Sequence, residues 1–223
     1  MNYIGVLAAM DKELKLILPL IKECKEININ NTQFFVGKME DCPVVIAKCG
    51  IGKVNAAVVA LTMIDTFHVS IIINTGVAGG TGKETKVLDV VLASKVAYHD
   101  VWCGPGTSEG QAAGCPPFFE CMDLDVNGVK KGLIVSGDVF VSRESDIAKI
   151  KTMYPEAMAV DMESAAIAQV CFLKNVPFVA LRVISDTPGK EDNVEQYQNF
   201  WEDAPKTTFT TLLDIIRSLN NHR

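Results

Sequence analysis

Apolar runs of strand length alternate with segments of helical periodicity along most of the chain. The runs that predict strands are residues 3–8, 34–39, 43–48, 69–73, 87–96, 132–136 and 176–184. Helical patterns cover residues 10–21 and 145–151, and a further helix after Gly50-Ile51-Gly52 is predicted to bury Val54, Val58, Leu61 and Ile64. A C-terminal helix has an apolar face formed by Phe209, Leu212, Leu213 and Ile216. This alternation predicts a single α/β domain over residues 1–223.

Acidic side chains follow or precede these elements at what should be one rim of the sheet. Asp161 and Glu163 stand at the start of a helical pattern, where the helix dipole favours carboxylates. Asp186 follows the apolar run 176–184, just before a Thr-Pro breaker. Ligands of open α/β sheets bind at the carboxyl ends of the strands, so the sequence predicts a site here.

Charge and cysteine usage restrict the class of protein. The net charge of −6 and the lack of a dense Lys/Arg run argue against nucleic-acid binding. The first residues lack the basic region of a signal peptide, and no apolar run approaches the roughly 20 residues that span a bilayer. The seven cysteines are scattered without a C-x-x-C pair. We therefore expect a cytoplasmic protein with reduced thiols that binds neither nucleic acid nor membrane.

Familiar cofactor and catalytic motifs are incomplete in this chain. The segment Gly50–Asn55 lacks the last glycine of the dinucleotide fingerprint, and Ala47 stands where a P-loop requires its first glycine. The chain has three histidines, no G-x-S-x-G elbow, and no His or Cys pairs at zinc-ligand spacing. We expect no metal and no cofactor.

Several short motifs nevertheless occur in the order and spacing of a known family. They are residues 8–13 (AAMDKE), 48–54 (KCGIGKV), 73–80 (INTGVAGG), 135–138 (VSGD), 161–163 (DME) and 182–186 (RVISD). From residue 3 to about residue 216 the chain resembles the 5′-methylthioadenosine/S-adenosylhomocysteine nucleosidases of the nucleoside phosphorylase superfamily. The resemblance implies a mixed central sheet flanked by helices, a homodimer, and cofactor-free hydrolysis of the adenine N-glycosidic bond of a small nucleoside.

Carried over residue by residue, the resemblance assigns the catalytic roles to two acids. Glu13 matches the acid that positions or activates the attacking water, and Asp186 matches the acid that protonates the purine ring nitrogen. Glu163 matches the residue that holds the ribose hydroxyls. The other substrate-binding matches are Met162 beside Glu163, Arg182 near the water, Ser185 supporting Asp186, and Phe140 and Val141 against the base.

Chemistry gives reasons for these residue types. The departing base gains negative charge, so a neutral acid must donate a proton to it. The sugar becomes oxocarbenium-like, and nearby carboxylates stabilise it, as in glycosidases. Burial among apolar neighbours raises the pKa of an aspartic acid such as Asp186 and keeps it protonated.

Each acid also has a simpler structural explanation. Asp186 is typical of an Asx-turn or helix cap, whereas Glu13 and Glu163 are typical dipole residues of a first helical turn. Arg182 in an apolar strand needs a buried partner in either case. Only the joint recurrence of these positions favours a catalytic role.

Hydrolysis must be separated from phosphorolysis. Phosphorylases of the superfamily surround phosphate with arginines on loops that correspond here to residues 8–13 and 74–77, which contain none. The acidic Glu13 would repel phosphate and suits a water. The alternatives are a nucleosidase or phosphorylase acting on another purine nucleoside, or a non-catalytic nucleoside-binding protein.

The chain departs from the family near the 5′ end of the substrate. Val77 replaces a common serine near the ribose. In residues 101–113, which reach the neighbouring subunit's pocket in the family, Pro105 and Thr107 replace aromatic residues and Ala113 replaces a proline. The pocket then either accepts a larger or more polar 5′ group, or still prefers methylthioadenosine. Candidate residues for this pocket are Met10, Trp102, Pro105, Thr107, Ala113, Tyr197 and Phe200.

Overall fold

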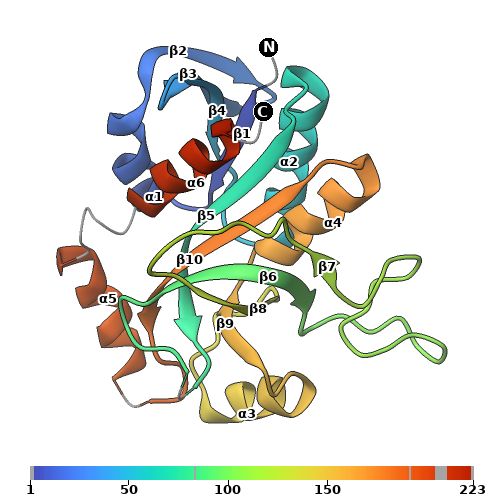
Figure 1. Cartoon of the computed structure of the whole chain (residues 1–223). Helices are drawn as coiled ribbons and strands as arrows, with labels where there is room; N and C mark the ends of the chain where they lie inside the picture. Colours follow the sequence, from blue (N-terminus) through green and yellow to red (C-terminus); the bar gives the residue numbers. More distant parts are fainter. Residues whose placement is uncertain (1–2, 83, 191, 204–209, 222–223) are drawn as a thin grey trace.

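A mixed sheet organises the part of the chain that the computed structural model describes, residues 3–82, 84–190, 192–203 and 210–221 (Figure 1). Its strands are β1 Ile4–Ala8, β2 Lys22–Ile29, β3 Thr32–Met39, β4 Cys42–Lys48, β5 Ile71–Gly80, β6 Val90–Tyr98, β7 Phe119–Glu120, β8 Lys130–Ser136, β9 Ala157–Asp161 and β10 Phe178–Asp186. Their order is β10-β6-β8-β9-β5-β1-β4-β3-β2, with β7 paired to β6. The predicted α/β class with a mixed sheet is confirmed.

Strand β10 pairs with both β6 and β5, so β10, β6, β8, β9 and β5 close on themselves. Strands β4, β1, β5 and β10 run parallel, and their carboxyl ends therefore open on the same rim. Strand β5 extends to Gly80, beyond the predicted end at residue 73, because β10 and β9 supply pairing partners for residues 74–80. The segment expected to be a loop is thus the distal half of a strand.

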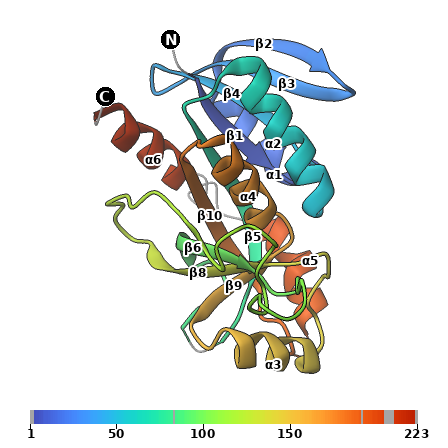
Figure 2. The same cartoon turned by 90° about the vertical axis from the view of Figure 1, so that its right-hand side faces the viewer.

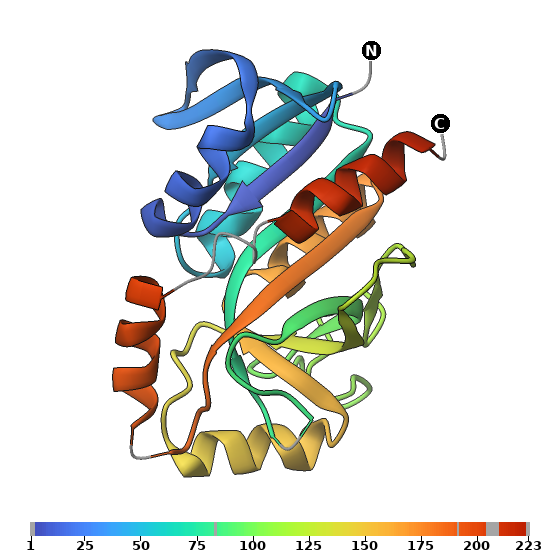
Figure 3. The same cartoon turned by 60° about the vertical axis from the view of Figure 1, so that its left-hand side comes forward.

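Helices cover both faces of the sheet. They are α1 Asp11–Ile17, α2 Lys53–Phe67, α3 Glu144–Met153, α4 Ser164–Lys174, α5 Asn193–Asp203 and α6 Thr210–Asn221, with a short 3₁₀ turn at Leu18–Leu20. Helices α1 and α6 lie on one face of β1 (Figure 3), whereas α2 and α4 pack side by side on the other (Figure 2). Strand β1 is buried on both faces, which explains its unbroken apolar sequence.

The predicted apolar face of α2 is wrong for most of its members. Val54 is 74% exposed, and Val58 and Leu61 are also exposed. The buried residues of α2 are instead Ala56, Val59, Ala60, Met63 and, as predicted, Ile64. Apolar residues occupy more than one side of this helix, and packing against α4 selects the side that carries the small alanines.

Other elements give little local signal. Strand β2 is exposed along nearly its whole length and forms through its pairing with β3. Helix α5 and strand β9 were likewise not predicted. Phe209, assigned to the C-terminal helical face, lies outside the described residues. Within the described ranges no helix has both the length and the apolar character needed to cross a bilayer.

Candidate active site

A pocket of about 100 Å³ opens at the rim where the parallel strands end. The structure brings together at its wall most of the residues predicted from the sequence: Glu13, Val77, Phe140, Val141, Met162, Glu163, Ser185 and Asp186, with Met10 and Tyr197 from the predicted 5′ pocket. Its acids come from segments that are far apart in the chain.

Glu13 lies in the first turn of α1 and is buried. Its Oε2 accepts hydrogen bonds from the backbone N–H groups of Ala9 at 2.8 Å and Met10 at 2.9 Å, and Oε1 accepts one from Val77 N–H at 2.9 Å. Burial raises the pKa of Glu13, while these backbone donors and the charge of Arg182 oppose that rise. The carboxylate is therefore fixed between the end of β1 and the middle of β5.

Glu163 is the N-cap residue of α4 and is only 6% exposed. Its Oε1 accepts a hydrogen bond from the backbone N–H of Gly52 at 2.9 Å. Burial, followed by the charge of Asp161, raises the pKa of Glu163 to about 7. The side chain thus faces the pocket with a carboxyl group that titrates near neutrality.

Asp186 ends β10, and its carboxyl group is held on both oxygens. Ser185 Oγ donates to Oδ1 at 2.6 Å, and the Asn193 amide on α5 donates to Oδ2. Burial raises the pKa of Asp186, and the two hydrogen bonds partly oppose this shift. Sequence reasoning missed Asn193, because nothing local marks an asparagine seven residues later as a partner of the acid.

The sequence and structure also match known proteins. Residues 3–217 match the family model described as "Phosphorylase superfamily". A Bacillus pumilus 5′-methylthioadenosine/S-adenosylhomocysteine nucleosidase is 37% identical, over 96% of this chain and 98% of that protein. The crystal structure of the Neisseria meningitidis nucleosidase with methylthio-immucillin-A is similar at a TM-score of 0.91 and 33% identity, covering 98% of this chain and 100% of that one. A Colwellia psychrerythraea nucleosidase in complex with adenine is also similar, with a TM-score of 0.91 and 33% identity, and the match covers 98% of this chain and 96% of that one.

This chain belongs to the 5′-methylthioadenosine/S-adenosylhomocysteine nucleosidase family. Of the described residues that line the pocket of this family member, none is Arg or Lys. Among those residues there is also no group of three or more His, Cys, Asp or Glu arranged to hold a metal ion.

Arg182, predicted to lie near the water, does not line the pocket of this nucleosidase family member. Its Nε donates to Asp161 at 2.9 Å, and its Nη atoms donate to Ser164 Oγ, the Asn74 side chain, and the carbonyls of Asn74 and Leu181. A guanidinium has five N–H groups, and all of them have protein acceptors here. Holding a water would require one of these bonds to be exchanged.

The predicted 5′ pocket divides into two groups in this family member. Met10 and Tyr197 line the pocket, and the Tyr197 hydroxyl lies 3.3 Å from the Met10 sulfur. Phe200 is buried against Trp201 instead. The members from the 101–113 segment do not line it: Trp102 is 63% exposed, Pro105 and Ala113 are exposed, and Thr107 is half-buried.

Proposed function

We propose that this protein hydrolyses the N-glycosidic bond of 5′-methylthioadenosine, S-adenosylhomocysteine or both, and releases adenine. The observation that carries the proposal is the convergence of three buried carboxyl groups, those of Glu13, Glu163 and Asp186, on one pocket in a member of this family. Solved relatives were crystallised with adenine and with methylthio-immucillin-A. A binding protein would have little use for three buried acids, since each is costly to bury.

Glu13 is assigned to the attacking water. A carboxylate has about four acceptor positions, and backbone N–H groups occupy two on Oε2 and one on Oε1. The remaining position on Oε1 accepts a proton from a water held between Glu13 and the sugar. The three fixed backbone bonds orient this carboxylate before the substrate arrives, which is what a general base requires.

Asp186 is assigned to protonation of the leaving purine. Burial favours its neutral form, and a neutral carboxylic acid is the species that can donate a proton to a ring nitrogen. Ser185 and Asn193 fix the orientation of the carboxyl plane. Phe140 and Val141, on the same pocket wall, pack against the base.

Glu163, with Met162 beside it, is assigned to the ribose. Its carboxylate accepts hydrogen bonds from the sugar hydroxyls, and its negative charge stabilises the oxocarbenium-like transition state. Arg182 acts on this site without lining the pocket. Its positive charge lowers the pKa of both Glu13 and Glu163 and so favours their ionised forms.

Water rather than phosphate is the proposed nucleophile. Phosphate would meet the carboxylates of Glu13 and Glu163 with no described pocket-lining cation to offset the repulsion. The test is incubation of the protein with methylthioadenosine, with and without phosphate, followed by chromatography. We expect adenine in equal yield in both, whereas a pentose 1-phosphate would identify a phosphorylase. Tight binding of the nucleoside without adenine release would instead identify a binding protein.

We further infer a homodimer in which residues 101–113 complete the neighbouring pocket. Exposed apolar residues gather on the two adjacent helices: Val54, Val58 and Leu61 on α2, and Phe172 and Leu173 on α4. The half-exposed Ile51 belongs both to this surface and to the pocket wall. Monomers rarely expose large apolar patches, and a second copy of the chain would cover these side chains.

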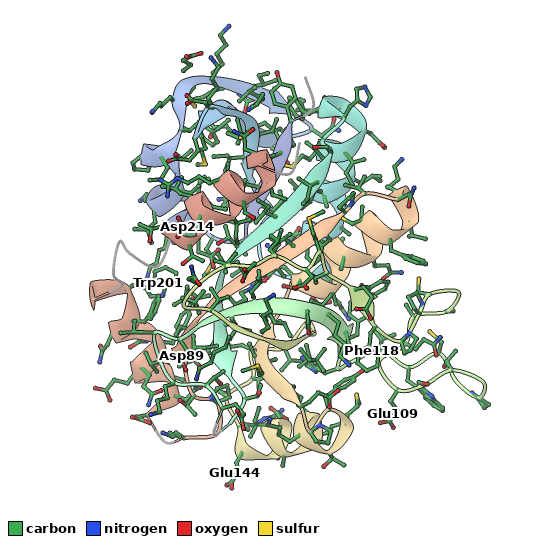
Figure 4. The ribbon with its side chains drawn as sticks, in the orientation of Figure 1. Asp89, Glu109, Phe118, Glu144, Trp201 and Asp214 are labelled. Atoms are coloured by element: carbon green, nitrogen blue, oxygen red, sulfur yellow. The ribbon has the colours of Figure 1, made fainter. Side chains whose placement is uncertain are left out.

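The position of the 101–113 segment supports this arrangement. Glu109, in that segment, lies on the opposite side of the molecule from Trp201 on α5, the helix that contributes Tyr197 to the pocket (Figure 4). The segment emerges on the same side as α2 and α4 (Figure 2). It is therefore far from its own 5′ subsite but well placed to reach one in a second copy.

The 5′ substituent depends on this segment. Replacement of aromatic walls by Pro105 and Thr107 removes apolar contacts, each worth about 10–200-fold in discrimination. Comparing kcat/KM for methylthioadenosine, adenosylhomocysteine, adenosine and inosine in wild type and Trp102→Ala tests the proposal of an altered pocket. A strong methylthioadenosine preference that Trp102→Ala leaves unchanged would favour a drifted segment with the usual substrate.

A further inference from the structure

Two of the sequence motifs, Gly50–Lys53 and Ser136-Gly137-Asp138, contribute no side chain to the chemistry proposed above. They meet in a cluster of three charged residues beside the pocket: Lys53, Asp100 and Asp138. We propose that this cluster is a positioning device that fixes the ribose-binding carboxylate of Glu163 relative to the base-binding wall at Phe140 and Val141. The inference rests on the proposed function.

The three residues form a closed ring of hydrogen bonds. The backbone N–H of Lys53 donates to Asp138 Oδ1 at 2.8 Å, and the backbone N–H of Asp138 donates to Asp100 Oδ2 at 2.8 Å. The Lys53 ammonium completes the ring with bonds of 2.9 and 2.8 Å to the two oxygens of Asp100. It also lies 3.7 Å from Asp138 Oδ2 and faces the Tyr98 ring at 5.4 Å from its centre.

Strand register explains why the two aspartates meet. Strands β6 and β8 are parallel neighbours in which Tyr98 pairs with Ser136, so Asp100 and Asp138 each follow a strand end by two residues and lie opposite each other. Gly137 permits this approach, since a Cβ there would overlap the His99 ring and come within 2.9 Å of Asp100 Cγ. Two adjacent carboxylates repel, and the Lys53 ammonium between them reduces that repulsion.

The ring is connected to the pocket at both ends. Lys53 is the first residue of α2, and the preceding N–H, that of Gly52, holds Glu163 Oε1 at 2.9 Å. Asp138 is followed directly by Val139, Phe140 and Val141, which line the pocket. No side chain within helix α2 caps its N-terminus. The carboxylates of Glu163 and Asp138, from other segments, accept hydrogen bonds from its first N–H groups instead. Adjacent backbone N–H groups thus set the spacing between the sugar anchor and the base wall.

Loss of the ring should separate the two halves of the pocket without removing either one. Without the Lys53 ammonium, Asp100 and Asp138 repel, and the 138–141 segment shifts relative to the start of α2. Each half still contacts its own part of the substrate, but the base and the sugar are no longer held in the geometry of bond cleavage. A misplacement of this kind, on the order of 1 Å, costs up to about 100-fold in rate.

The test compares turnover of the whole substrate, methylthioadenosine, with binding of its base alone, adenine. The variants are Lys53→Met, Lys53→Arg and Asp100→Asn. For Lys53→Met we expect kcat for methylthioadenosine to fall about 10- to 100-fold, while the inhibition constant of adenine changes less than about threefold. Lys53→Arg keeps the charge and should recover most of kcat. Asp100→Asn keeps the shape of the side chain and should also lower kcat. In the double variant with Lys53→Met, the fold-loss in kcat should be smaller than the product of the two single fold-losses.

The matched control is Lys131→Met. Lys131 forms an ion pair of 2.6 Å with Asp123 near the opposite end of β8, away from the pocket, and its loss should leave kcat unchanged. Wild-type kcat in Lys53→Met, even with a lower melting temperature, would overturn the inference and reduce the ring to a helix cap. A loss of adenine affinity as large as the loss of kcat would also overturn it. If Lys53→Met fails to fold, Asp100→Asn decides.

Failure of the proposed hydrolysis can be distinguished from failure of the positioning role. If the hydrolysis is wrong, the wild-type protein releases no adenine. The same variants are then compared by calorimetric binding of methylthioadenosine and of adenine. Weaker binding of the nucleoside alone supports the positioning role, and unchanged binding of both overturns it.

Discussion

Glu13 and Gly76 approach each other so closely that any side chain at position 76 would overlap the Glu13 carboxylate. Gly76 immediately precedes Val77, whose N–H binds Glu13 Oε1 at 2.9 Å. The glycine is thus the reason that a carboxylate from α1 can reach the backbone of β5.

Gly76→Ala should therefore displace the proposed general base. We expect kcat/KM to fall by at least about 100-fold, since catalytic groups tolerate little misplacement. Gly128→Ala is the control, because its added methyl group meets open space and carries only the backbone cost of a φ of +75°, about 1–2 kcal/mol. Near-normal activity of Gly76→Ala would show that Glu13 does not need this position.

The assignments of acid and base predict large losses for isosteric changes. Asp186→Asn has no acidic proton to donate and Glu13→Gln cannot accept one, so each should lower kcat by about 10²–10⁴-fold. Asp192→Asn, an exposed aspartate near the same strand end, provides the control. Adenine release is measured under single-turnover conditions, with circular dichroism to confirm folding. Wild-type turnover in folded Asp186→Asn would exclude it as the acid.

The raised pKa of Glu163 has a consequence for stability. Its folded-state pKa of about 7 lies above the ordinary 4.5, so the folded protein holds the proton more tightly than the unfolded chain. The resulting stabilisation is complete below pH 4.5 and is lost as pH rises to about 7, an upper estimate of roughly 3 kcal/mol. Glu163→Gln, which is inactive in our assignment, should therefore be more stable than wild type at pH 8.

Melting temperatures at pH 5 and pH 8 check this expectation. The advantage of Glu163→Gln should be present at pH 8 and small at pH 5. Glu120→Gln, an exposed change of the same net charge, should show no such difference. Equal or lower stability of Glu163→Gln at both values would contradict a buried carboxyl that resists ionisation.

Asn193→Ala should shift the pH dependence of activity. The Asn193 amide donates to Asp186 and thereby lowers the pKa of that carboxyl group, so its removal raises the pKa further. The acid must be protonated to act, so activity should persist to a higher pH on the basic limb of kcat/KM than in the wild type. Gln196→Ala, which removes a bond to the backbone of Thr187 from the same helix, is the control. If the basic limb of the pH profile of kcat/KM stays at the same pH or shifts to lower pH, Asn193 does not lower the pKa of the catalytic acid.

Val58→Glu tests the proposed homodimer. A charge on the exposed apolar surface of α2 should give monomers in sedimentation experiments, since burying an unpaired carboxylate in an interface is costly. Because the partner would supply the wall of the 5′ subsite, kcat/KM should fall more for methylthioadenosine than for adenosine. Ile27→Glu adds the same charge to the exposed strand β2 and should leave the assembly intact. A monomeric wild type would refute the dimer.

The sequence by itself determined the features that depend on local pattern. The apolar run 176–184 predicted a buried parallel strand, because a strand covered on both faces has no polar side to show. The short motifs around Glu13, Glu163 and Asp186 were sufficient to predict the family and to name the acids that the structure brings to one pocket. Motif order is a property of the chain and survives without coordinates.

Only the tertiary structure decided the features that depend on which surfaces meet. Helix α2 has apolar residues on more than one side, and contact with α4 determined that the alanine side is buried and Val54 exposed. Strand β2 forms because β3 offers a free edge. The acceptors of the Arg182 hydrogen bonds, which include Asp161 and Asn74, are also identified only by the tertiary structure. Asn193 meets Asp186 across a turn, and Lys53 meets Asp100 across 47 residues of chain. Both pairings arise from strand register and packing, which no local pattern encodes.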